Sequence, residues 1–94
     1  MKQLSGIEDI KSKIQYCKDA IEPYRSYGDI AVQALNALSE LETLIVNLDK
    51  QNLEKALAIA RELDSEVAPY SSFLPTVADY LRTIKDWLEE RSKG

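Results

Sequence analysis

Two proline-containing segments of similar sequence divide this chain into four stretches. Pro23-Tyr24-Arg25-Ser26-Tyr27 is followed 46 residues later (69 − 23 = 46) by Pro69-Tyr70-Ser71-Ser72-Phe73. Proline has no amide hydrogen to donate and disfavours helical geometry in the residue before it, so each segment predicts the end of a helix. We therefore expect the chain to reverse direction at both places.

The same offset of 46 residues (69 − 23 = 46) aligns apolar positions on both sides of these segments. The aligned pairs are Ile7/Leu53, Ile10/Ala56, Ile14/Ala60, Cys17/Leu63, Ile21/Val67, Ala31/Val77, Leu35/Leu81, Leu38/Ile84 and Leu41/Trp87. An internal repeat of this length predicts two similar helical hairpins. Few aligned residues are identical, so the sequence leaves open whether the repeat is an ancestral duplication or a coincidence between two amphipathic hairpins.

Apolar residues within each stretch recur at intervals of three and four, which is the spacing of helices packed in a bundle. The chain has only three Gly and three Pro, and four helices joined by short links favour an up-down path. We predict an all-α, antiparallel, up-down four-helix bundle made of two similar helical hairpins. It forms a single domain over residues 1–94, with hairpin 1 at about 5–48 and hairpin 2 at about 51–92. A three-helix variant, or a dimer in which hairpins from two chains form the bundle, fits the same pattern.

Helix starts are indicated by residues that can cap the first turn or that are tolerated in it. These are Ser5 with Glu8, Ser26 with Asp29 or else Asp29 alone after Gly28, Asp49 or Asn52 at about residues 50–53, and, for the last helix, Ser72 or else a start one or two residues later with Pro75 in the first turn.

The charge of the chain argues against several partners. The net charge is −4, and neither half is basic. Without a cluster of Lys and Arg the chain lacks the electrostatic footprint for nucleic acid, so we expect no nucleic-acid partner. The most apolar run, residues 30–48, contains too many polar groups for a membrane span. With one cysteine and no apolar segment after Met1, the sequence predicts a cytoplasmic protein.

Catalytic chemistry is not indicated by the composition. The chain has no histidine, which is the commonest general base and zinc ligand. Cys17 lies on the apolar face of the first helix, where a small buried side chain is expected, and the three glycines are too far apart for a phosphate loop. We therefore predict no enzyme activity, no catalytic residue and no cofactor. Glu62, Asp64 and Glu66 are weak candidates for a metal site, because the Glu-x-x-His ligands of carboxylate bundles are missing.

Aromatic residues at the two turns form the best candidate binding surface. An up-down path brings both turns to one end, and we expect five residues there to bind a partner: Tyr24, Arg25, Tyr27, Tyr70 and Phe73. Tyrosine is favoured at recognition surfaces, although the rings would also serve to close the end of the core. The sequence predicts a small non-enzymatic protein-interaction module (an adaptor, inhibitor, immunity-type or regulatory protein) that binds another protein or itself. The alternatives are a helical bundle that binds a metal or a small ligand, for instance in a cavity between the hairpins, and a structural subunit of a larger assembly.

Overall fold

The computed structural model describes residues 2–93, with side chains from residue 6 onwards, and all of its regular elements are helical. The four α-helices are α1 (Lys2–Ile21), α2 (Asp29–Val46), α3 (Lys50–Val67) and α4 (Pro75–Lys93). Two 3-10 segments, η1 (Glu22–Tyr27) and η2 (Ala68–Tyr70), continue α1 and α3 into the turns.

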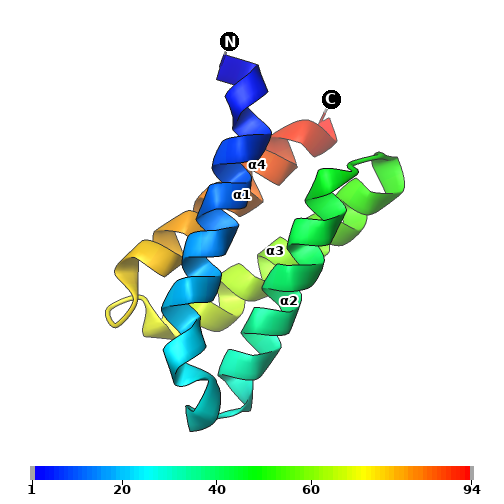
Figure 1. Ribbon diagram of the computed structural model, residues 1–94. Coiled ribbons are helices and arrows are strands. Elements are labelled where there is room, and N and C mark those ends of the chain that lie inside the picture. The colour runs from blue at the N-terminus through cyan, green and yellow to red at the C-terminus, as the bar shows by residue number, and fades with distance from the viewer. Residues whose placement is uncertain (1, 94) are drawn as a thin grey trace.

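The helices form an antiparallel bundle in which α1 packs against α2 and α4, and α3 packs against the same two helices. In Figure 1 the chain runs down α1, up α2, down α3 and up α4, so that both proline-containing turns lie at one end. The predicted four-helix bundle of two hairpins is thereby confirmed. No helix within residues 2–93 is both long enough and apolar enough to cross a membrane.

The helix boundaries repeat with the offset found in the sequence. The helix α1 ends at Ile21 and α3 at Val67 (67 − 21 = 46), while α2 begins at Asp29 and α4 at Pro75 (75 − 29 = 46). The aligned apolar pairs in which both members are buried are Ile10/Ala56, Ile14/Ala60, Cys17/Leu63, Ile21/Val67, Leu35/Leu81 and Leu38/Ile84. The two hairpins therefore resemble each other in where they turn and in which positions they bury.

The core consists of the apolar side chains that recur every three and four residues. Leu38, Leu41, Leu81, Ile84 and Leu88 are fully buried, and among the described side chains no polar or charged residue is classed as buried. Some large apolar residues near helix ends are exposed instead: Ile7, Ile30 and Val46 are 36, 51 and 64 % exposed.

The predicted start of α1 is wrong, the range predicted for the start of α3 is confirmed, and α2 and α4 begin near the later of the two starts predicted for each. The helix α1 begins at Lys2, so Ser5 lies inside it, and the Ser5 side chain is outside the described part of the chain. Ser26 lies within η1, and Gly28 takes the N-cap position of α2, since the turn of η1 continues to residue 27. Asp49 caps α3 as expected, with its Oδ1 accepting a hydrogen bond from the Asn52 amide at 2.8 Å. The helix α4 begins at Pro75.

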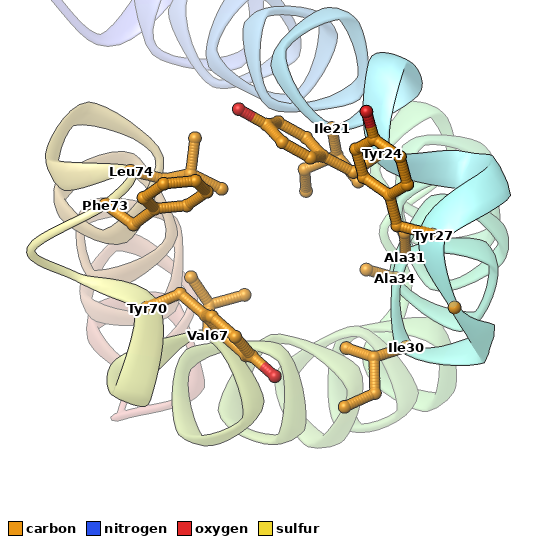
Figure 2. Close-up of a pocket in the computed structure, with 11 residues that line it drawn as sticks. Ile21, Tyr24, Tyr27, Ile30, Ala31, Ala34, Val67, Tyr70, Phe73 and Leu74 are labelled. Carbon is orange, nitrogen blue, oxygen red and sulfur yellow. The ribbon is translucent and has the colours of Figure 1, made fainter.

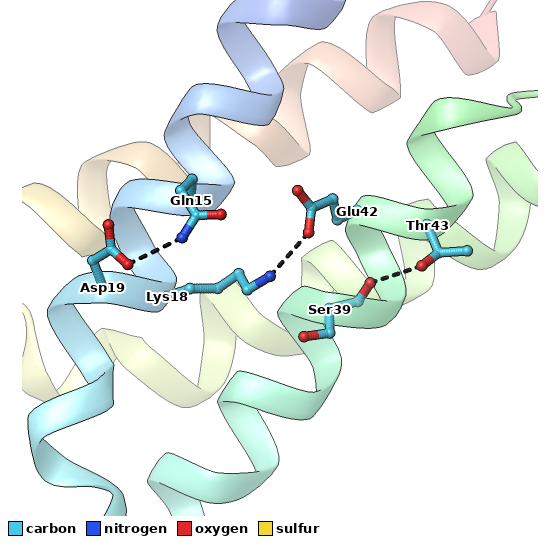
Figure 3. A network of polar contacts seen from close by, with 6 residues as sticks. All are labelled: Gln15, Lys18, Asp19, Ser39, Glu42 and Thr43. Carbon is cyan, nitrogen blue, oxygen red and sulfur yellow. Dashed lines mark hydrogen bonds and ion pairs between the residues drawn. The ribbon is translucent and has the colours of Figure 1, made fainter.

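Within residues 6–93, ion pairs join the two helices of each hairpin, one in hairpin 1 and two in hairpin 2, where Arg61 Nε lies 3.3 Å from Glu89 Oε2. Lys18 Nζ lies 2.9 Å from Glu42 Oε1 and links α1 to α2 (Figure 3). Lys85 Nζ lies 3.5 Å from Asp64 Oδ2 and links α4 to α3. Lys18 and Asp64 occupy equivalent positions of the repeat (64 − 18 = 46), but their charges are opposite. Partly exposed pairs of this kind contribute little to stability, and the fold depends mainly on its apolar core.

Candidate functional site

An apolar cavity of about 320 Å³ opens at the end of the bundle where both turns lie, and we call it the aromatic cavity. Its walls come from both hairpins, whose side chains face one another around the opening in Figure 2. The lining residues are Ile21, Tyr24, Tyr27, Gly28, Ile30, Ala31, Ala34, Val67, Tyr70, Phe73 and Leu74.

The aromatic cavity has a buried floor and an exposed rim. Ile21, Ala34 and Val67 form the floor and are 5, 3 and 6 % exposed. Tyr27 and Phe73 stand at the rim and are 80 and 65 % exposed. A ligand in the cavity would therefore contact buried aliphatic groups at the floor, and aromatic rings would surround it at the mouth.

The rings at the mouth are in contact with one another across the two hairpins. The Tyr24 ring centroid lies 5.8 Å from that of Tyr27 and 5.8 Å from that of Phe73, with tilted ring planes in both pairs. Tyr70 lines the same cavity from η2. The expectation that the four rings gather at one end is met. With most of the Tyr27 and Phe73 surfaces facing solvent, these two rings do not seal the core.

Two residues that line the aromatic cavity are smaller than their equivalents in the other hairpin. Ala31 and Ala34 of α2 correspond to Val77 and Tyr80 of α4 (77 − 31 = 46; 80 − 34 = 46). In hairpin 2 the Tyr80 ring fills its place by packing against Tyr16, with 5.1 Å between ring centroids. In hairpin 1 the equivalent positions carry only methyl groups, and both alanines line the aromatic cavity.

Arg25 is the one predicted partner-binding residue that does not line the aromatic cavity. Its Nε lies 3.2 Å from Glu22 Oε2, and both side chains are more than half exposed. Within the described part of the chain, the lining residues carry no formal charge, and the only polar side-chain atoms among them are the three tyrosine hydroxyls. The cavity is thus suited to apolar groups, with a few hydroxyls to orient them.

The structure gives no support to a metal site at the predicted acidic residues. Among the described residues, no group of three or more His, Cys, Asp and Glu side chains is arranged to hold a metal ion. Asp64 is paired with Lys85, and Glu62 is exposed on the surface of α3. Cys17 is fully buried, and this burial raises the pKa of its thiol from 9.0 to about 12. The thiol is therefore protonated at neutral pH and unsuited to act as a nucleophile.

Sequence reasoning found the rings but missed the residues that create the space behind them. In the sequence, Ile21, Ala31 and Val67 are identified only as aligned apolar positions; the structure shows that all three line the aromatic cavity. The signal that could have revealed the cavity is the size difference at equivalent repeat positions, alanine against valine or tyrosine.

A hollow with Asp49, Lys50 and Arg91 in its walls lies at the opposite end and has a charged character.

No protein-family model, no curated protein and no solved structure matches this chain.

Proposed function

We propose that this chain is a small non-enzymatic protein-interaction module that binds a partner protein, or a second copy of itself, with the end of the bundle that carries the aromatic cavity. The observation that carries this proposal is the concentration of exposed apolar side chains at that end. Tyr27, Ile30, Tyr70 and Phe73 are 80, 51, 41 and 65 % exposed and line one cavity. Contiguous exposed apolar surface on a small protein is typical of interaction sites.

The chemistry of the four rings supports the same proposal. Aromatic side chains supply large contact areas with few rotatable bonds, and tyrosine is enriched among the residues that dominate binding energies. Tyr24 and Tyr27 lie on η1, Tyr70 lies on η2, and Phe73 lies in the link between η2 and α4. Each 3-10 segment has a proline near its start and continues a helix whose last residue, Ile21 or Val67, is buried. Such a surface is arranged before binding, which lowers the entropy cost of association.

Site-specific photo-crosslinking in the native cell tests the proposal. The photoreactive residue p-benzoylphenylalanine replaces Tyr27 in one variant and Val46 in a matched control, because Val46 is 64 % exposed but lies at the other end of α2. We expect a defined crosslinked product from position 27 and none from position 46. A product of twice the chain mass would identify the partner as a second copy.

A second substitution checks that the rings bind the partner. Phe73→Ser, introduced beside the photoreactive residue at position 27, should abolish the product while circular dichroism still reports a fully helical chain, since Phe73 is 65 % exposed. The proposal is refuted if both positions give the same products, or if the product from position 27 survives Phe73→Ser.

The aromatic cavity favours a second candidate function, which is the binding of a small ligand between the two hairpins. A volume of about 320 Å³ falls at the lower end of the range of ligand pockets. Thermal denaturation with and without a small-molecule library tests this candidate, because a ligand that binds only the native state raises the melting temperature.

A further inference from the structure

We infer that the aromatic cavity binds an uncharged, mostly apolar molecule the size of a fused two-ring aromatic compound, with its polar atom at the mouth beside the tyrosine hydroxyls. This inference rests on the second candidate function, ligand binding between the hairpins, and specifies the chemical class of the ligand.

The volume of the cavity sets the size of the ligand. An apolar cavity of about 150 Å³ in another protein binds benzene. The aromatic cavity, at about 320 Å³, is roughly twice as large and accommodates two fused rings. A single ring would leave part of the space without contacts, and dispersion attraction falls steeply across such gaps.

The lining excludes an anionic ligand. A carboxylate placed on the floor formed by Ile21, Ala34 and Val67 would lose its hydration without gaining a cation, and that desolvation is costly. Arg25, the one cationic side chain on η1, is paired with Glu22 and lies outside the lining.

A cationic ligand is also disfavoured, even though aromatic rings attract cations. Cation–π contacts act only near the ring faces, which stand at the mouth. The floor is aliphatic, and the described lining contains no carboxylate to compensate the charge. An ammonium group that reached the floor would therefore be desolvated without compensation.

The test uses three probes in NMR titrations of the full chain labelled with nitrogen-15. All three probes have the same two fused rings: the neutral probe is 2-naphthol, the anionic probe is 2-naphthoate, and the cationic probe is 2-naphthyltrimethylammonium. At pH 7, we expect 2-naphthol to shift the amide signals of Ile30, Ala31, Ala34, Val67 and Tyr70 in a saturable manner. We expect the two charged probes to bind there at least tenfold more weakly.

Two variants locate the binding in the cavity. Ala34→Leu adds three carbon atoms at the floor and should weaken 2-naphthol binding at least tenfold. The control Ala58→Leu makes the same change at an exposed position of α3 and should leave binding unchanged. If the spectrum of Ala34→Leu shows that it does not fold, Phe73→Ala at the exposed rim replaces it, with a weakening of at least threefold expected.

Each outcome separates the inferred ligand class from ligand binding as such. Equal or tighter binding of 2-naphthoate or 2-naphthyltrimethylammonium at the same amides overturns the inferred class and leaves the candidate function standing. Binding of 2-naphthol that is unaffected by the cavity variants overturns the site. If none of the probes produces a saturable shift at these amides, both the inference and the second candidate function are refuted.

Discussion

Replacement of Leu38 by alanine tests whether the stability of this bundle depends on the layers in which all four helices overlap. Leu38 lies in α2 and has no exposed surface, and its repeat equivalent Ile84 (84 − 38 = 46) is equally buried in α4. The substitution removes three carbon atoms from water-free surroundings. At about 0.8 kcal/mol for each carbon, the lost transfer free energy is roughly 2.4 kcal/mol.

The cavity left behind by Leu38→Ala adds to this loss. Buried Leu→Ala substitutions in well-packed proteins cost about 3–5 kcal/mol in total, because neighbouring side chains relax only partly. A loss of this size is a large part of the 5–15 kcal/mol by which a typical domain is stable. For a domain of this length, it should lower the melting temperature by at least about 12 °C.

Urea denaturation provides the measurement, followed by circular dichroism and by the fluorescence of Trp87, the only tryptophan. The matched control is Val46→Ala, at a position in the same helix that is 64 % exposed. This control should cost less than about 0.5 kcal/mol, as surface substitutions usually do. If Leu38→Ala costs less than about 1 kcal/mol, or no more than the control, the assignment of the core is wrong.

Three further predictions concern a helix cap, a link and a buried thiol. Asp49→Ala should cost about 1 kcal/mol in urea denaturation, because the Asn52 amide loses its hydrogen bond; an unchanged midpoint would contradict this. Gly28→Ser should raise the melting temperature and the free energy of unfolding, the latter by about 0.5–1 kcal/mol. The backbone at Gly28 is extended, a Cβ added there meets nothing within 4 Å, and serine is a better N-cap than glycine. A loss of stability would show that this position needs glycine. Burial raises the pKa of the Cys17 thiol from 9.0 to about 12. Its contribution to stability is therefore fully present below pH 9.0 and falls as the pH rises from 9.0 towards 12, because in that range the thiol ionises in the unfolded chain but not in the folded one. The free energy of unfolding should therefore fall between pH 9 and 10.5 more steeply in the wild type than in Cys17→Ala, by up to about 1.4 kcal/mol per pH unit, and equal slopes would refute the burial argument.

Much of the fold was predictable because helical periodicity is a local property of the sequence. Side chains three and four residues apart lie on one face of a helix whatever surrounds it, and Pro23 and Pro69 act on their immediate neighbours. The end of α1 at Ile21 and the end of α3 at Val67 follow from these local effects. So does the cap at Asp49, where donor and acceptor are three residues apart.

The capping motifs that begin at Ser5 and Ser26 do not mark the helix starts that the structure has. Ser5 and Glu8 have the spacing of a capping box, but α1 extends past them to Lys2. Ser26 and Asp29 have the same spacing, yet the 3-10 turn after Pro23 continues to Tyr27 and moves the start of α2 to Asp29. A capping motif is compatible with a helix start at its first residue, but the helix begins there only if the preceding residues are not themselves helical.

The sequence by itself determined four amphipathic helices, their reversals at the two proline-containing turns, and the gathering of four aromatic rings at one end. Only the tertiary structure decided that these rings surround a cavity. That outcome depends on how Ala31 and Ala34 of one hairpin face Val67 and Phe73 of the other. The cavity depends on packing between residues that are far apart in the chain, and the spacing of apolar residues within one helix does not predict such packing.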